Sequence, residues 1–196
     1  IPPVDQIEFE PPPGFRRSHR GVAPGTWSDD GSQALCLFES LIEHTELDLV
    51  DFANRLVRWH DDAHLQAGGR VFDVGIQTYR ALGRIKDGHA PHLAGGHTER
   101  ENGNGSLMRT GPLALAFLDD PAGLVDAAMK VSALTHYDWY AQEACAVWSL
   151  LIRHGVLTAQ IPKFSDIAQW SPRPEFWAES LQTAQDSPAS DFTENA

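Results

Sequence analysis

Hydrophobic residues recur at three- and four-residue steps along most of the chain, a spacing that is typical of amphipathic helices. The pattern predicts helices at residues 28–42, 48–59, 73–86, 105–118, 122–134 and 137–153, with a weaker one at 175–185. Alternating β-branched runs, which would indicate strands, are nearly absent. We therefore predict an all-α fold, an orthogonal multi-helix bundle with long loops, that occupies residues 1–196 as a single domain.

Two loops interrupt this helical pattern. Prolines cluster in residues 1–26, which excludes a regular helix there and predicts an extended, Pro-rich loop. Because a domain seldom begins inside such a loop, we expect the chain to be an internal piece of a longer protein. The second loop, residues 87–104, is rich in Gly, His and Asn and is long enough to carry a function.

The charge balance limits the possible partners. With 15 Lys and Arg residues against 27 Asp and Glu residues, the formal charge is −12, which argues against nucleic-acid binding through the general surface. An anionic ligand would need local compensation, for which a metal ion is the simplest candidate. We find no secretory signal and no apolar stretch near the roughly 20 residues that span a bilayer, so we expect a cytoplasmic location and no membrane.

The two cysteines, Cys36 and Cys145, lie in apolar stretches with helical spacing. One disulfide between them is possible, but two buried free thiols in a reducing compartment fit a chain of this kind better.

The sharpest candidate for chemistry is the sequence GTWSDDGS at residues 25–32, where a helix is predicted to begin. Ser28, Asp29 and Asp30 supply a hydroxyl and two carboxylates, which are hard oxygen ligands suited to Mg²⁺ or Mn²⁺. The alternative is that Ser28 is an N-cap and that the two acids only complement the helix dipole.

A second candidate is ENGNGSLMR at residues 101–109. Its glycines and asparagines could expose successive backbone N–H groups just before a helix, which would form an anion-binding nest. The alternative is a Gly-rich turn followed by an ordinary helix cap.

Three further features carry titratable side chains. His136, between two predicted helices, could donate to a ligand oxygen or cap a carbonyl, and Asp73 could be a site acid or a helix cap. His60 and His64 stand four residues apart with acids between them, a spacing that also occurs in metal-dependent phosphohydrolases of the HD type. The HD-type interpretation needs further ligands on other helices, so we favour the alternative that His60 and His64 belong to a solvated helix end.

Taken in order, these segments resemble the ADP-ribosylglycohydrolase family of the dinitrogenase-reductase-activating type. The resemblance rests on GTWSDD at 25–30, FDVGIQT at 72–78, NGNGSLMR at 102–109 and TH at 135–136. It implies an all-α domain that binds two Mg²⁺ or Mn²⁺ ions. It also implies hydrolysis of the glycosidic bond that joins ADP-ribose to a protein side chain or small acceptor, by a metal-assisted attack of water.

The resemblance also implies roles for individual residues. The metal ligands would be Ser28, Asp29 and Asp30, and the catalytic acids would be Asp29, Asp30 and Asp73. The groups that line the ADP-ribose would be Asn104, Gly105, Ser106, Met108 and His136. The partner would be an ADP-ribosylated protein or a small molecule that contains ADP-ribose.

The chain departs from the family pattern in three places. The opening Gly-Asp-Ala-x-Gly segment with its Glu and the closing Gly-x-Asp-Thr-Asp segment do not occur in it, and Gly31 replaces a Thr that is common in the family. A catalytically silent module that still binds ADP-ribose therefore stays open as an alternative.

Overall fold

The computed structural model describes residues 21–22, 26–44 and 46–186, and within these ranges it contains α-helices and short 3₁₀ turns but no strand. The helices are α1 (Asp29–Glu43), α2 (Leu49–Asp62), α3 (Ile76–Lys86), α4 (Gly111–Ala116), α5 (Pro121–Ala133), α6 (Trp139–Thr158) and α7 (Pro174–Asp186). The all-α prediction is confirmed. Most of the predicted Pro-rich loop, residues 1–26, lies outside the described residues.

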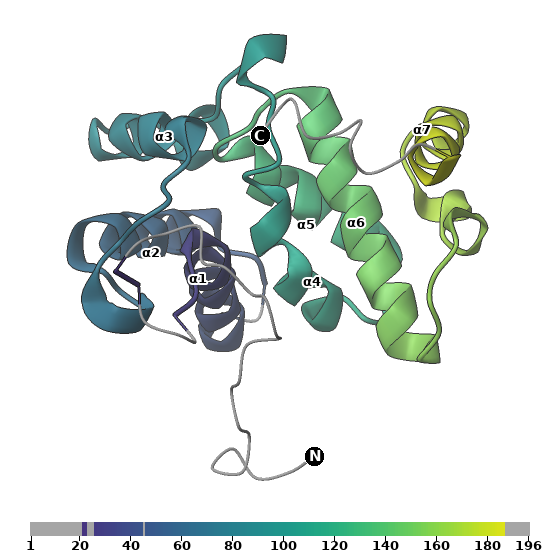
Figure 1. Ribbon diagram of the computed structural model, residues 1–196, viewed down its shortest axis with the longest axis horizontal. Coiled ribbons are helices and arrows are strands. Elements are labelled where there is room, and N and C mark those ends of the chain that lie inside the picture. The colour runs from purple at the N-terminus through teal and green to yellow at the C-terminus, as the bar shows by residue number, and fades with distance from the viewer. Residues whose placement is uncertain (1–20, 23–25, 45, 187–196) are drawn as a thin grey trace, which may run out of the picture.

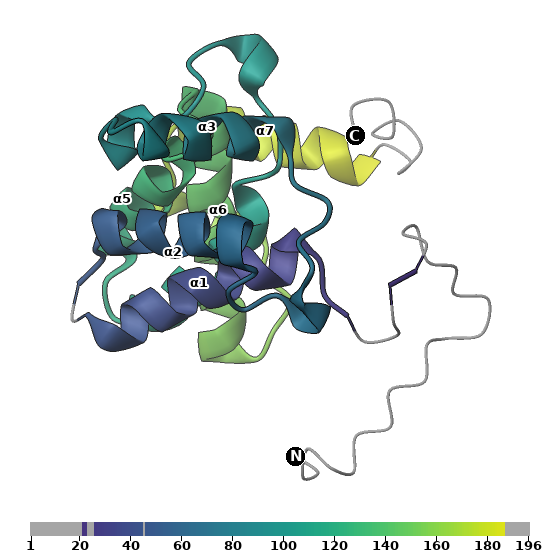
Figure 2. The same ribbon diagram turned by 90° about the vertical axis from the view of Figure 1, so that its left-hand side faces the viewer.

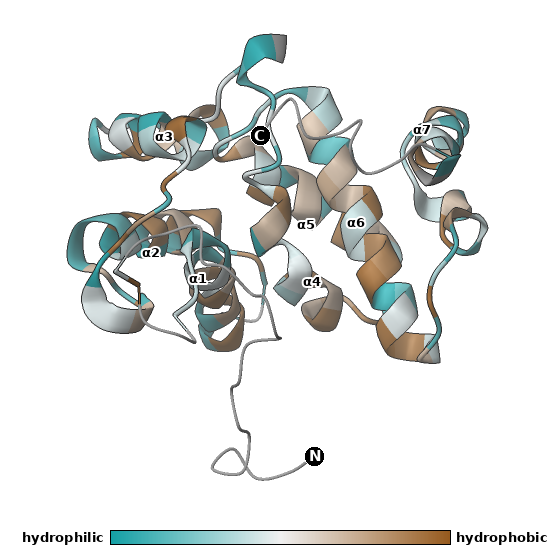
Figure 3. Cartoon of the chain, in the orientation of Figure 1, coloured by the Kyte–Doolittle hydropathy of each residue, from teal (hydrophilic) through white to brown (hydrophobic). Residues whose placement is uncertain are grey.

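Helices α5 and α6 form the most extensive pairing and lie at the centre of the molecule (Figure 1). Helices α3, α2 and α1 are stacked one below another beside this pair (Figure 2), and α7 lies on the far side of α6. Hydrophobic residues are prominent on α5 and α6 (Figure 3), as expected for two helices that pack against each other and against α4. No helix in the described part of the chain is both long and apolar enough to cross a bilayer.

The core is built from the apolar faces that the sequence pattern marks. Fully buried side chains include Leu37, Phe52, Trp59, Leu82, Leu124 and Leu150. Burying an aliphatic or aromatic side chain of this size stabilises the fold by about 1.5–3 kcal/mol relative to leaving it in water. Cys36 and Cys145 are both buried and unpaired, as expected for free thiols.

Two predicted helices differ from the structure near the candidate site. The helix expected at residues 105–118 is a 3₁₀ turn, Leu107–Arg109, followed by the six-residue α4. Pro112 lies at the start of α4, where its missing N–H costs nothing, whereas it would interrupt a continuous helix. The helix expected from residue 73 begins only at Ile76, because Asp73 has a positive φ of 61° that a helix cannot contain.

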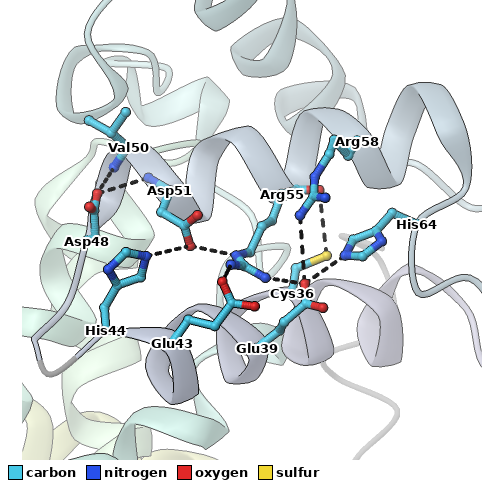
Figure 4. A network of polar contacts seen from close by, with 10 residues as sticks. All are labelled: Cys36, Glu39, Glu43, His44, Asp48, Val50, Asp51, Arg55, Arg58 and His64. Carbon is cyan, nitrogen blue, oxygen red and sulfur yellow. Dashed lines mark hydrogen bonds and ion pairs between the residues drawn. The ribbon is translucent and has the colours of Figure 1, made fainter.

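A buried guanidinium joins α1 to α2. The side chain of Arg55 is only 4% exposed and forms ion pairs with Glu39, Glu43 and Asp51 (Figure 4). Its Nε donates to Asp51 Oδ2 over 2.5 Å and Nη2 donates to Glu43 Oε2 over 2.6 Å. The hydrogen bond to Asp51, opposed by burial and reinforced by Glu43 and Glu39, raises the pKa of Arg55 above its usual value.

We expect Arg55→Met to lower the free energy of unfolding by about 2 kcal/mol, because Glu39, Glu43 and Asp51 would then lose the buried cation that they share. The matched control is Arg58→Met, which removes a half-exposed guanidinium that lies 3.8 Å from Glu39, and it should change stability by less than ~0.5 kcal/mol. Urea unfolding of both variants measures the difference. Equal effects would show that the buried cluster does not hold the two helices together.

Candidate active site

The start of α1 carries a hydroxyl that is turned toward a carboxylate. Ser28 occupies the N-cap position, but its side chain makes no hydrogen bond to the helix backbone. Instead, Ser28 Oγ donates to Asp30 Oδ2 over 2.6 Å. The simple capping interpretation of the Ser28 hydroxyl is therefore wrong, and the hydroxyl and carboxylate oxygens lie together.

Asp29 brings a third oxygen group to this place, and its side chain is largely buried, with only 6% of the residue exposed. Burial, followed by the negative charges of Asp30 and Asp73, raises the pKa of Asp29 to about 6, although the hydrogen bond with Ser28 opposes this shift. Because Asp73 acts electrostatically on Asp29, the fold brings the FDVGIQT segment close to the start of α1.

Asp73 is not a helix cap. The N-cap of α3 is Gly75, while Asp73 adopts a left-handed backbone conformation two residues earlier. Asp is one of the few residue types that tolerate this conformation, and such backbone positions cluster at functional sites. Asp73 therefore does not occupy the N-cap position of α3.

The segment before α1 is held by a buried amide. Gln66 Nε2 donates to the Trp27 carbonyl over 2.9 Å, and Gln66 Oε1 accepts from Ser32 Oγ over 2.9 Å. The Trp27 ring covers Gly31 so closely that a Cβ there would lie 2.8 Å from two ring atoms. The replacement of the family's usual Thr by Gly31 therefore accommodates Trp27.

The Gly- and Asn-rich segment packs against the corner that contains His136. A Cβ on Gly105 would lie 3.1 Å from His136 Cε1, and a Cβ on Gly103 would lie 3.6 Å from His136 Nε2. Neither glycine has a positive φ, and a three-residue 3₁₀ turn follows in place of a helix. The expected helix therefore does not begin directly after this segment, and the absence of a Cβ at Gly105 leaves room for the imidazole.

The fold separates Ser106 from its neighbours in the motif. Ser106 is buried, and its Oγ pairs with Ser132 Oγ at 2.9 Å and with Cys145 Sγ at 3.3 Å. Asn104 is exposed, whereas Asn102 Nδ2 donates to Asp138 Oδ1 over 2.9 Å. Ser106 thus anchors the segment to the interior, and Asn104 is free to face a ligand.

His136 is buried, with 3% of the residue exposed, and its Nδ1 lies 2.7 Å from Thr135 Oγ1. Burial, followed by the positive charge of Arg109, lowers the pKa of His136 to about 4. The imidazole is therefore neutral at pH 7, so it can donate from one nitrogen while the other accepts.

A cavity of about 500 Å³ joins the two halves of the site. Its lining consists of Asp30, Gly31, Ala34, Asn104, Leu107, Met108 and Trp148. It brings Asp30 from α1 together with Asn104 and Met108 from the glycine-rich segment. The other predicted site residues are not in its lining: Ser28, Asp29, Asp73, Gly105, Ser106 and His136. The lining combines the carboxylate of Asp30 and the amide of Asn104 with apolar side chains, as in many small-molecule sites.

The oxygen groups at the start of α1 have the chemistry of Mg²⁺ or Mn²⁺ ligands. Ser28, Asp29 and Asp30 offer a hydroxyl and two carboxylates, and the mutual repulsion that raises the pKa of Asp29 would be relieved by a cation. In the described ranges, however, no three His, Cys, Asp or Glu side chains form a group that could hold a metal ion. These residues therefore fit part of a coordination shell.

The HD-type alternative finds no support in the geometry. Helix α2 ends at Asp62, so His60 and His64 do not share a helical face. His60 Nδ1 pairs with Asp61 Oδ1 at 2.6 Å, whereas His64 Nε2 pairs with Glu39 Oε2 on α1 at 2.7 Å. The two imidazoles thus serve different partners.

An all-helical fold in which a hydroxyl and acids meet a Gly- and Asn-rich segment is the arrangement implied for ADP-ribosylglycohydrolases. A family model described as ADP-ribosylglycohydrolase matches residues 3–195. This chain belongs to the ADP-ribosylglycohydrolase family.

Individual relatives match parts of the chain. It is 37% identical over 95 residues to the ADP-ribosylarginine hydrolase Tri1 of Pseudomonas putida, covering 48% of this chain and 25% of that protein. It is 29% identical over 133 residues to the ADP-ribosyl-(dinitrogen reductase) glycohydrolase of Rhodospirillum rubrum, covering 68% of this chain and 42% of that protein.

A solved structure described as an ADP-ribosylglycohydrolase-related protein complex matches with a TM-score of 0.59 at 35% identity, covering 75% of this chain and 45% of that chain. The chain thus spans less than half the length of each of these proteins.

Sequence reasoning missed several residues that shape the site. Trp148 of α6 lines the cavity, and Gln66 accepts and donates hydrogen bonds that hold the segment before α1. The side chain of Arg109 donates a hydrogen bond to Gln33 on α1. Arg109 stood within a recognised motif, but its burial carries no local signal. The two glutamines and Trp148 belong to no motif, so only their long-range contacts reveal them.

Because the pKa of His136 is low in the folded state, the free energy of unfolding should depend on pH in the acid range. The unfolded state protonates this group below about pH 6.5, but the folded state does so only near pH 4. Between these values the unfolded state binds more protons, so stability falls as pH falls, by about 3 kcal/mol across the window. Urea unfolding at pH 7 and pH 4.5 should therefore show a smaller loss for His136→Gln than for the original chain. If His136→Gln and the original chain lost equal amounts of unfolding free energy between pH 7 and pH 4.5, the claim that the imidazole is buried and neutral would be contradicted.

Proposed function

We propose that this chain carries the active site of a metal-dependent hydrolase that cleaves the glycosidic bond between ADP-ribose and a protein side chain or small acceptor. The observation that carries the proposal is the cavity that has Asp30 on one side and Asn104 and Met108 on the other. The relatives named for hydrolysis of ADP-ribosylarginine and of ADP-ribosyl dinitrogen reductase support arginine or protein linkages as substrates.

The metal would be Mg²⁺ or Mn²⁺, held by Ser28, Asp29 and Asp30. When bound, it would supply positive charge that offsets the pyrophosphate and would orient and acidify a water for attack on the anomeric carbon. This compensation matters because the chain itself has a formal charge of −12.

The protein groups would bind and orient the substrate. The Asn104 amide can donate to and accept from ribose hydroxyls, and neutral His136 can donate to a ribose or phosphate oxygen. The negative charge of Asp73, close to Asp29, would stabilise the positive charge that develops at the anomeric carbon. Leu107, Met108 and Trp148 give the cavity an apolar wall that would exclude water from the bound group.

Gly105 and Ser106 would act on the substrate through this framework. Gly105 leaves room for the His136 ring, and the buried Ser106 hydroxyl fixes the segment from below. We propose that backbone groups of residues 104–106 face the ADP-ribose and that the Ser106 side chain does not touch it.

We expect Asp29→Asn with Asp30→Asn to lower the rate of ADP-ribose release from ADP-ribosylated arginine by about 100-fold or more, because a metal contributes several kcal/mol to the transition state. EDTA should abolish the same activity. The matched control is Asp61→Asn with Asp62→Asn, another pair of adjacent acids, at the end of α2. An unchanged rate in the first variant, or a loss confined to the second, would contradict the proposed site.

A second candidate, an ADP-ribose-binding module without turnover, is favoured by the incomplete metal-binding group among the described residues. Calorimetry of the 196-residue chain with ADP-ribose separates the two functions when it is combined with the release assay. Binding with no release in Mg²⁺ or Mn²⁺ supports the module, and release supports the hydrolase.

A further inference from the structure

The strongest unassigned feature is a buried hydrogen-bond chain that ends on His136. We propose that Arg109 and Thr135 are positioning residues that fix the His136 imidazole as a hydrogen-bond donor from Nε2 toward the Gly103–Gly105 segment. The ligand that would receive this hydrogen bond, an oxygen of ADP-ribose, rests on the proposed function. The series of hydrogen bonds from Arg109 through Thr135 to His136 rests only on the contacts described below.

Arg109 is the first residue of this series of hydrogen bonds, and it is completely buried, with 0% of the residue exposed. Its Nη1 donates to Gln33 Oε1 over 2.9 Å, and its Nη2 donates to the Val131 carbonyl over 2.9 Å and to Thr135 Oγ1 over 2.6 Å. All three acceptors are uncharged. The planar guanidinium can reach them together because its N–H groups form a rigid fork, which a Lys ammonium would not reproduce.

The Arg109 contact leaves the Thr135 hydroxyl hydrogen in need of an acceptor. An Arg N–H can only donate, so Thr135 Oγ1 accepts from Arg109 and keeps its own hydrogen available. His136 Nδ1 lies 2.7 Å from that oxygen, and the proposal assigns the hydroxyl hydrogen to it. A neutral imidazole that accepts at Nδ1 carries its proton on Nε2.

The environment of the ring favours this single protonation state. Burial and the nearby charge of Arg109 both oppose a second proton and lower the pKa of His136 to about 4. On the other edge of the ring, Nε2 would lie 3.4 Å from a Cβ on Gly105 and 3.6 Å from one on Gly103. The donor nitrogen therefore faces the glycine-rich segment.

The backbone around His136 is fixed as firmly as the ring. The Gly96 N–H donates to the Thr135 carbonyl over 3.2 Å, and the Tyr137 N–H donates to the Gly96 carbonyl over 2.9 Å. A Cβ at Gly95 would lie 2.2 Å from the Ala133 carbonyl oxygen, so only glycine allows this approach. The imidazole is thus held in place from its backbone and from Nδ1.

Nuclear magnetic resonance of the ¹⁵N-histidine-labelled 196-residue chain without ligand tests the positioning. The imidazole nitrogen shifts at pH 7 should show His136 protonated on Nε2 in the original chain. Thr135→Val, which removes the hydroxyl, should mix the two tautomers or move the proton to Nδ1, and Thr135→Ser, which restores a hydroxyl, should recover the original spectrum.

Three results would overturn the inference: a proton on Nδ1 in the original chain, an unchanged tautomer in Thr135→Val, or no recovery in folded Thr135→Ser. The first of these needs no variant, so the test holds even where Thr135→Val does not fold. A purely structural role of Thr135 would alter stability without moving the tautomer.

Titration with ADP-ribose separates this inference from the proposed function. Thr135→Val should bind about tenfold more weakly than the original chain, a loss that corresponds to one hydrogen bond, and Thr135→Ser should bind nearly as well. If the tautomer responds as expected but neither the original chain nor any variant binds ADP-ribose, the positioning of His136 by Arg109 and Thr135 is supported. The proposal that ADP-ribose is the ligand is then contradicted. If folded Thr135→Val has an altered tautomer but binds ADP-ribose as tightly as the original chain, His136 does not take part in ligand recognition.

Discussion

The buried guanidinium of Arg109 is the interaction on which the site depends. It ties Gln33 on α1, the Val131 carbonyl on α5 and the Thr135 hydroxyl into one arrangement. Because a buried charge that lost these hydrogen bonds would be strongly destabilising, the three contacts are costly to break. The three acceptors therefore have little freedom to move, and the acidic end of α1 is fixed relative to the corner that contains His136.

This constraint explains how a strongly acidic chain can present a site for an anionic group. The carboxylates gather at the start of α1, where Asp29 is buried among like charges, and the neutral donors gather on the glycine-rich segment opposite. Burial, followed by the positive charge of Arg109, lowers the pKa of His136 and keeps its imidazole neutral at pH 7. Under the proposed function, Asp30 and Asn104, which both line the cavity, would allow a metal to bridge the protein and a pyrophosphate.

Much of this organisation could be predicted from the sequence because its causes are local. Helical spacing and the Asp48 cap correctly mark α2, and the hydroxyl and acids of Ser28–Asp30 stand together in both sequence and structure. The continuous helix over residues 105–118 was wrong because Pro112 and the buried Arg109 impose a break that spacing does not reveal. The roles of Gln66, Arg109 and Trp148 depend on contacts between residues far apart in the chain, for which no local pattern exists.

The central claim is that the acidic start of α1 and the glycine-rich segment form one metal-assisted site. Paramagnetic Mn²⁺ added to the ¹⁵N-labelled chain tests it directly, because the ion broadens amide signals that lie near it. The account predicts that signals of Asp29, Asp30, Gly103 and Gly105 broaden first and together. Broadening that begins instead at Asp61 and Asp62, with Gly103 and Gly105 unaffected, would contradict it.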